Sequence, residues 1–99
     1  MTEMAMKLNS EKEYIENKLS ETFKSKKINN TRCFFLNDGM VFRISLMGSS
    51  EPWNALVIEY AEDEAKMAIN MADDGDLFYS SEYKSIDDMY NDMLKEINS

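Results

Sequence analysis

Residues 32–47 read RCFFLNDGMVFRISLM, two apolar runs that flank the tripeptide Asn37-Asp38-Gly39. Glycine adopts positive φ without a Cβ clash, so Gly39 suits a hairpin loop whose twist matches the strands that it joins. In the second run Phe42, Ile44 and Leu46 alternate with polar residues. Side chains of a strand point alternately to its two faces, so this alternation predicts that these three residues form the core side of a central strand.

The length of the loop decides the register of this hairpin, and the sequence allows two lengths. A two-residue turn at Asp38-Gly39 would set Phe35 opposite Phe42, whereas a three-residue loop with a glycine bulge would set Phe34 opposite Phe42. A slip of one residue exchanges the two faces of a strand, so the faces of the first strand stay open at this point.

In either register one of Phe34 and Phe35 shares the outer face of the sheet with Val41. The apolar patch on that face is either covered by a helix or exposed as a surface for self-association or for a partner. Cys33 belongs to the same strand and has no second cysteine to pair with. We therefore expect no disulfide and no cysteine-based zinc site, and we interpret Cys33 as a small buried strand residue.

Length and composition indicate one small globular unit. The 99 residues are 43% hydrophobic, with three glycines and one proline. A chain of this length buries roughly two thirds of its unfolded surface in one core. We expect a single domain over residues 1–99, with residues 1–9 as a leader that packs or frays. No stretch has the character of a signal peptide or a membrane span, which predicts a soluble, cytoplasmic protein.

A first helix is predicted over residues 11–26. Ser10-Glu11-Lys12-Glu13 has the form of a capping box, in which the serine hydroxyl and the glutamate satisfy free backbone N–H groups. Apolar residues recur at helical spacing as far as Phe23, and the lysines at positions 24, 26 and 27 stand where cations favour a helix C-terminus. Asn29-Asn30 is then expected to turn the chain into the hairpin.

A third strand and a second helix are expected after the hairpin. Residues 53–60, WNALVIEY, predict a strand with Leu56, Ile58 and Tyr60 on one side. The short connection before it predicts an antiparallel meander with the strand of residues 40–47 in the middle. Acidic residues at 62–64 and alanines at helical spacing predict a helix that ends at Gly75.

The last helix has the clearest periodicity in the chain. Its apolar residues fall at i, i+3, i+4, i+7, i+8 and i+11, and they are Ile86, Met89, Tyr90, Met93, Leu94 and Ile97. Ser85 is the expected cap, and residues 76–79 before it are expected to be a short strand or a buried loop anchor. The predicted order is α-β-β-β-α-α, an α+β fold in which a three-stranded antiparallel meander sheet packs with helices.

Several kinds of chemistry are excluded or disfavoured. The chain has no histidine, so serine and cysteine triads and histidine-ligated zinc lack a member. Asp73-Asp74-Gly75-Asp76 lacks the ligand spacing of a calcium-binding loop, which needs acidic residues at alternating positions. This stretch is therefore interpreted as a polar turn and not as a metal site. No carboxylate is singled out as a catalytic acid or base. We expect neither an enzyme nor a cofactor.

Charge carries the most information about function. Residues 1–50 hold six acidic and eight basic residues, a balance of +2, and residues 51–99 hold thirteen acidic and three basic residues, a balance of −10. A strongly anionic half disfavours direct binding of nucleic acid and favours a basic partner. The alternative is a solvated surface that keeps the protein in solution.

The predicted element order, the Asn37-Asp38-Gly39 hairpin and the helix that reads DDMYNDM over residues 87–93 resemble the small acidic anti-CRISPR proteins of phages, which inhibit type II RNA-guided nucleases. The resemblance covers residues 37–97. It implies that the acidic surface imitates a DNA duplex and occupies the site where the nuclease reads its short DNA signal.

Charge also predicts the partner-binding residues without the resemblance. A site that reads DNA is lined by lysine and arginine, and carboxylates on a rigid scaffold can compete for it. The carboxylates expected to do so are Asp73, Asp74, Asp76, Glu82, Asp87, Asp88 and Asp92. Two alternatives remain: an immunity-like or antitoxin-like protein that neutralises a nuclease, and a phage or host accessory protein that assembles through its outer sheet face.

Overall fold

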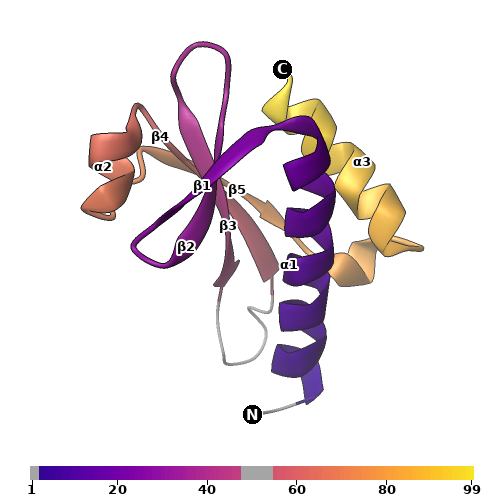
Figure 1. Cartoon of the computed structure of the whole chain (residues 1–99). Coiled ribbons are helices and arrows are strands. Elements are labelled where there is room, and N and C mark those ends of the chain that lie inside the picture. The colour runs from indigo at the N-terminus through magenta and orange to yellow at the C-terminus, as the bar shows by residue number, and fades with distance from the viewer. Residues whose placement is uncertain (1–2, 48–54) are drawn as a thin grey trace.

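A five-stranded antiparallel sheet forms the centre of the computed structural model, which describes residues 3–47 and 55–99 (Figure 1). The order across the sheet, β1-β2-β3-β4-β5, is the order along the chain. The strands are β1 (Lys24–Ile28), β2 (Thr31–Phe35), β3 (Val41–Met47), β4 (Ala55–Ala61) and β5 (Asp74–Phe78). The α+β class and the antiparallel meander centred on β3 are confirmed, but the predicted number of three strands is wrong.

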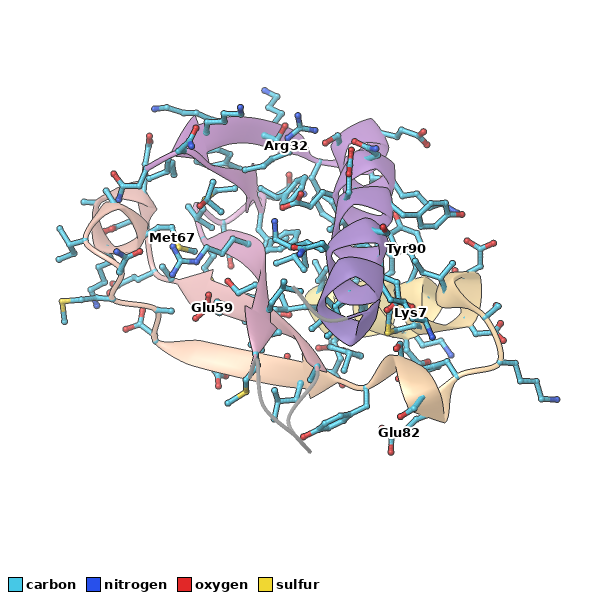
Figure 2. The ribbon with its side chains drawn as sticks, turned by 90° about the horizontal axis from the view of Figure 1, so that it is seen from below. Lys7, Arg32, Glu59, Met67, Glu82 and Tyr90 are labelled. Atoms are coloured by element: carbon cyan, nitrogen blue, oxygen red, sulfur yellow. The ribbon has the colours of Figure 1, made fainter. Side chains whose placement is uncertain are left out.

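Helices cover both faces of the sheet. α1 (Glu3–Thr22) and α3 (Ile86–Ile97) lie side by side on one face, and the short α2 (Glu64–Ala68) lies on the other (Figure 1). A 3₁₀ turn, η1 (Ser80–Glu82), leads from β5 into α3. Figure 2 shows Met67 of α2 and Tyr90 of α3, the latter beside α1, on opposite sides of the sheet.

The central hairpin adopts the three-residue loop. Phe34 lies opposite Phe42, and the Leu36 N–H donates to the Met40 carbonyl over 2.9 Å. Gly39 has a φ of 93°, and its N–H donates to the Leu36 carbonyl over 3.1 Å. The two-residue alternative is excluded, since it would place Phe35 opposite Phe42.

The main core lies between β3 and the pair formed by α1 and α3. Phe42 and Ile44 are fully buried there, as their alternation predicts, whereas Leu46 at the far end of the strand is 38% exposed. The Phe42 ring stacks on Phe34 at 5.2 Å and meets the edge of Phe23 at 5.4 Å, measured between ring centroids. The third strand also agrees with prediction, because its three inward residues, Leu56, Ile58 and Tyr60, are all buried. Residues 53 and 54 of that prediction lie outside the described residues.

The first helix begins and ends earlier than predicted. It starts at Glu3, so Ser10 lies inside the helix and the predicted capping box does not form. Leu8 extends the apolar stripe of Ile15 and Leu19 by two turns toward the N-terminus and is only 2% exposed. The burial of Leu8 therefore stabilises helical structure before Ser10.

The three lysines that were expected to end this helix belong to the edge strand β1. β1 and β2 are joined by Asn29-Asn30, with φ of 52° and 66°. Asparagine tolerates this left-handed region, which a two-residue hairpin turn requires. The predicted turn is confirmed, but it joins two strands and not a helix and a strand.

The second helix is also shorter than predicted. It ends at Ala68, and Asn70, with a φ of 58°, takes the place that was assigned to Gly75. The Met71 N–H donates to the Lys66 carbonyl over 2.9 Å, which is the long bond of a Schellman motif. Gly75 instead lies in β5 opposite Glu59. Of residues 76–79, which were predicted to be a short strand or a loop anchor, residues 76–78 belong to this longer edge strand.

α2 covers one end of the outer sheet face. Beneath it, a second cluster of buried side chains forms, and its members are Ile28, Cys33, Val41, Ala61 and Met67, with Phe35 packed against them. Cys33 is fully buried, as interpreted from the sequence, and its burial raises the pKa of its thiol. Of the two alternatives for the predicted apolar patch, coverage by a helix is therefore confirmed at the end that contains Val41.

Candidate partner-binding site

Several carboxylates of this acidic protein are already paired with lysine or arginine. Arg43 Nε lies 3.0 Å from Glu59, directly opposite it on the neighbouring strand, and Arg43 also donates to Asn70 on the α2 side. Lys26 binds Glu64, and Lys12 binds Glu16 at 3.1 Å. These acidic side chains form ion pairs within the protein, so the candidate site is found among the other carboxylates.

Of the seven predicted site residues, Asp87 is bound most firmly within the protein. Its carboxylate accepts a hydrogen bond from the Tyr14 hydroxyl over 2.6 Å and lies 3.1 Å from Lys18 Nζ. These two hydrogen bonds lower the pKa of Asp87, the bond from Tyr14 being the larger cause. Lys18 also lies over the Tyr90 ring at 5.0 Å. Asp87 therefore joins α3 to α1.

Asp73 and Asp92 also have partners inside the protein. Asp73 accepts from the Glu62 N–H over 3.1 Å and lies 3.6 Å from Lys66 Nζ. Asp92 accepts from the Tyr83 hydroxyl over 2.9 Å, and burial followed by this bond raises the pKa of Tyr83. Lys95 lies 4.0 Å from Asp92, at the limit of an ion pair. The two side chains are about equally exposed, at 49% for Asp73 and 48% for Asp92.

Asp88 and Glu82 lie near the start of α3, exposed to solvent. The Ser85 hydroxyl accepts from the Asp88 N–H over 3.2 Å, which confirms the predicted cap. Glu82 lies in η1, and Figure 2 shows it on the turn below α3, on the far side of the molecule from Met67. These two carboxylates extend the acidic surface without forming its centre.

The centre is a hollow of about 320 Å³ between the central hairpin loop, the sheet edge and the C-terminal end of α3. We name it the acidic hollow. It is lined by Leu36, Asp38, Met40, Tyr60, Asp74, Asp76, Glu96, Ile97 and Ser99. Strand pairing explains part of this set, because Asp74 lies opposite Tyr60 and Asp76 opposite Ile58, on the face that carries α1 and α3.

Four carboxylates thus meet in the acidic hollow. None of the described residues that line it is a lysine or arginine, and none of the ion pairs found in residues 7–47 and 55–99 involves Asp38, Asp74, Asp76 or Glu96. A neighbouring hollow shares Asp76 and Glu96 and adds Asp92 and Lys95. The acidic surface therefore continues from β5 onto α3, where Lys95 adds one positive charge.

Tyr60 is the one aromatic residue at the base of the acidic hollow. Its hydroxyl is buried, and Asp76 acts on it both through its negative charge and through a hydrogen bond. Burial, and after it the negative charges of Asp76 and Glu96, raise the pKa of Tyr60 well above its usual range. The hydroxyl is therefore protonated at neutral pH and well above it.

Sequence reasoning found Asp74 and Asp76 but missed Asp38, Tyr60 and Glu96. The signal that could have found Tyr60 was the alternation of β5, had residues 74–78 been interpreted as a strand beside β4. Asp38 was assigned only to a turn, and Glu96 was not among the predicted site residues. Their proximity depends on where the hairpin loop lies against the end of α3, which no local pattern encodes.

A second polar hollow has a mixed charge. It lies between α1 and the β1–β2 hairpin, where Lys12, Lys27 and Arg32 alternate with Glu13 and Glu16. Arg32 donates to the Ser20 hydroxyl over 2.8 Å, so part of its charge is used inside the protein. Mixed sign and internal pairing distinguish this hollow from the acidic one.

The geometry gives no support to a metal centre. In the described part of the chain, no three carboxylates or thiols come together in a way that could hold a metal ion.

Comparison of the chain with protein-family models, with curated proteins and with solved structures gave no match. No helix within the described ranges is long and apolar enough to cross a membrane. Arguments about function therefore rest on the acidic hollow and on the surface around it.

Proposed function

We propose that the protein is a small acidic inhibitor that presents carboxylates to the basic nucleic-acid site of a nuclease. The observation that carries this proposal is the acidic hollow, in which four carboxylates meet without a lysine or arginine among the described lining residues. Duplex DNA carries one negative charge per ~1.7 Å of its axis, and sites that read it are lined with cations. A folded surface with unpaired carboxylates competes for the same cations.

These carboxylates lie on regular secondary structure whose position is fixed by the core. Asp74 and Asp76 lie on a strand, and Glu96 and Asp92 on a helix whose buried side, including Met93 and Ile97, is fixed by the core. Side chains on such elements lose little further freedom on binding. Asp73 and Asp87 contribute less than their charge suggests, because they are bound within the protein.

The resemblance to anti-CRISPR proteins points to an RNA-guided nuclease as the partner. The same charge argument also fits an immunity-like or antitoxin-like protein that covers a nuclease. These two candidates differ in the partner and not in the surface, so identification of the captured nuclease separates them.

The test begins with capture of partners from bacterial lysate at low and at moderate salt. We expect a nuclease whose release increases with salt, because charges at the rim act mainly on the association rate and are screened. Duplex DNA should compete with the protein for the purified nuclease, and the protein should inhibit cleavage. A partner whose binding is indifferent to both salt and DNA would refute the proposal.

A matched pair of double variants then locates the surface. Asp74→Lys with Asp92→Lys reverses two charges at the acidic hollow and beside it. Glu13→Lys with Glu21→Lys makes the same change in net charge on exposed positions of α1. The first pair should weaken binding at least about tenfold, equivalent to ~1.4 kcal/mol, and the second pair much less. Equal losses would mean that only net charge matters.

A second candidate function is assembly through the outer sheet face. Met47 and Leu77 are each 45% exposed there, at the end that α2 does not cover. Exposed apolar patches mark surfaces for association when they are large and contiguous. Sedimentation at increasing protein concentration tests this function, and a concentration-dependent dimer that Leu77→Ser abolishes would support it.

A further inference from the structure

The two edges of the sheet are open and carry opposite charge. β1 reads KSKKI, and β5 reads DGDLF. Within residues 3–47 and 55–99, each of these strands pairs with one neighbouring strand only, so its other side presents backbone groups that no strand takes up. The first four residues of β1 are exposed, and so are Asp74, Gly75 and Leu77 of β5. Both edges are therefore accessible to a further strand.

Strand pairing shows which face of the sheet each charge lies on. Residues directly opposite each other on neighbouring strands point to the same face. Lys24 and Lys26 lie opposite two side chains that pack beneath α2, so they point to that face. Asp74 and Asp76 lie opposite two residues of the main core, so they point to the face of α1 and α3. Each edge therefore carries a pair of like charges on one face.

Two copies of the chain gain little from pairing like edges. β1 against β1 would bring lysines together, and β5 against β5 would bring aspartates together. Like charges on facing strands are destabilising, and charged side chains protect open edges in this way. β5 against β1 of a second copy brings opposite charges together instead. Charge complementarity therefore selects a contact between unlike edges.

The faces decide how the second copy is oriented. Because neighbouring strands are all antiparallel, β1 and β5 run in the same direction. A copy shifted without rotation would add its β1 parallel to β5 and would bring only Lys27 to the face of the aspartates. A copy rotated by half a turn about the line across the strands adds its β1 antiparallel, with its two faces exchanged. Lys24 and Lys26 then lie on the face of Asp74 and Asp76, and antiparallel pairing is also slightly the more stable.

We propose that a second copy of this chain docks with its β1 antiparallel to β5, so that Asp74 lies opposite Lys26 and Asp76 opposite Lys24. The residues between these charges, a glycine and a serine, are small and meet on the other face. The contact leaves β1 of the first copy and β5 of the second open, so further copies add in a row. It involves this protein alone and is therefore independent of the proposed function.

Two effects keep this contact weak. Lys26 binds Glu64, and Asp74 accepts a hydrogen bond from the Gly75 N–H over 2.8 Å, so both charges are partly engaged within each copy. Each copy also has a net charge of −8, which opposes approach until salt screens it. Association is therefore expected at millimolar protein concentration and physiological ionic strength.

The test follows the labelled protein by NMR as it is diluted from millimolar to micromolar concentration. We expect concentration-dependent chemical shifts of the backbone N–H groups of β1 and β5, and slower hydrogen exchange of these groups in the concentrated sample. Sedimentation of the same samples should show an average mass that rises above the monomer with concentration.

Two double variants show whether unlike edges make the contact. Lys24→Asp with Lys26→Asp makes both edges acidic, and Asp74→Lys with Asp76→Lys makes both basic. Each should weaken self-association at least about tenfold, since favourable pairs become repulsive. The second variant brings the net charge closer to zero, so its loss cannot come from greater overall repulsion. An equal mixture of the two, or one chain with all four changes, should associate as the wild type does.

Single variants keep the test decisive if a double variant fails to fold. Lys24 has no ion pair in residues 7–47 and 55–99, so Lys24→Asp leaves the described contacts of the fold intact. Lys84→Asp is the matched control, because it makes the same change in net charge at an exposed position away from both edges. Lys24→Asp should weaken association more than Lys84→Asp does.

Each outcome supports or overturns the edge contact. Loss in the double variants that the mixture restores supports it. A wild type that stays monomeric at millimolar concentration overturns it, and so do double variants that associate as well as the wild type, or equal losses in Lys24→Asp and Lys84→Asp. Association that Leu77→Ser abolishes while both double variants retain it would assign the contact to the outer sheet face.

Discussion

Phe42, at 0% exposure on β3, contacts three other aromatic rings of the core. Its ring contacts Phe34 on β2, Phe23 after α1 and Tyr60 on β4, with centroids 5.2, 5.4 and 6.1 Å away. Aromatic pairs at such distances add to the free energy gained by burial alone. Since Tyr60 also lines the acidic hollow, Phe42 connects the core to the candidate site.

Truncation of this residue should be costly. Phe42→Ala is expected to lower the free energy of unfolding by about 3–5 kcal/mol, as other core aromatic truncations do. Leu46→Ala is the control on the same strand face, and because Leu46 is 38% exposed it should cost about 1 kcal/mol or less. Urea melts followed by fluorescence measure both. Similar costs for the two variants would contradict the assignment of the core centre.

Asp87 makes the contact between α3 and α1 dependent on pH. The pKa of Asp87 is lowered in the folded state, so its contribution to stability is complete above the ordinary aspartate value of about 3.9 and is lost as pH falls through the folded-state pKa. Asp87→Asn should therefore lower the melting temperature at pH 7, and the difference from wild type should begin to shrink below about pH 4 and disappear once the pH is below the lowered folded-state pKa.

Asp88→Asn is the control for this experiment, since it removes the same charge one residue further along α3. Its difference from wild type should be smaller at pH 7, because Asp88 is exposed and no hydrogen bond or ion pair of its carboxylate is found in the described part of the chain. If the two variants behaved alike across the pH range, the Tyr14 and Lys18 contacts would have no measurable part in stability.

At the scale of elements, the β1–β2 hairpin depends on the backbone of its two-residue turn. Asn30, with a φ of 66°, is in a region that costs alanine about 1 kcal/mol or more. Asn30→Ala should therefore destabilise the protein by about that amount relative to Asn30→Gly, which adopts the same φ without strain. Chemical denaturation of the two variants gives this difference directly. If the variants proved equally stable, backbone strain would not govern the turn.

The elements that the sequence predicts well are those whose burial follows a period. α3 was predicted from six apolar positions at helical spacing, and β3 and β4 from alternation around Phe42 and Ile58. β1 was missed because in KSKKI only Ile28 is buried, so an edge strand without alternation is indistinguishable from the lysine-rich end of a helix. The helix start predicted at Ser10 was wrong for a similar reason, since a capping sequence inside a helix has the same residues as one at a helix start.

The candidate site was predicted in its charge but not in its geometry. Asp74 and Asp76 were named from acidic density alone. The inclusion of Asp38 depends on the loop that the Gly39 register selects, and Tyr60 became part of the site because β5 pairs with β4. Contacts between segments so far apart in sequence arise from tertiary packing, which local propensity does not contain.

At the scale of the whole molecule, repulsion among carboxylates opposes folding. The net charge is −8, and the four acids of the hollow have no basic neighbour among its described lining residues. Raising sodium chloride from low to physiological concentration should raise the melting temperature gradually, because screening weakens this repulsion. Magnesium or calcium at matched ionic strength should raise the melting temperature little beyond the effect of sodium chloride. Saturable binding of either ion with a micromolar dissociation constant in calorimetry, lost in Asp76→Asn, would contradict this expectation.

Because the strand order follows the chain, the uneven charge of the sequence becomes a spatial separation. Lys24, Lys26 and Lys27 lie on the edge strand β1, and Asp74 and Asp76 on the opposite edge strand β5. The protein therefore carries a permanent electric dipole moment across the sheet in addition to its net charge. If the partner is a cationic surface, as proposed, this field turns the β5 edge toward it before contact, so that a larger share of collisions begins with the acidic hollow facing that surface.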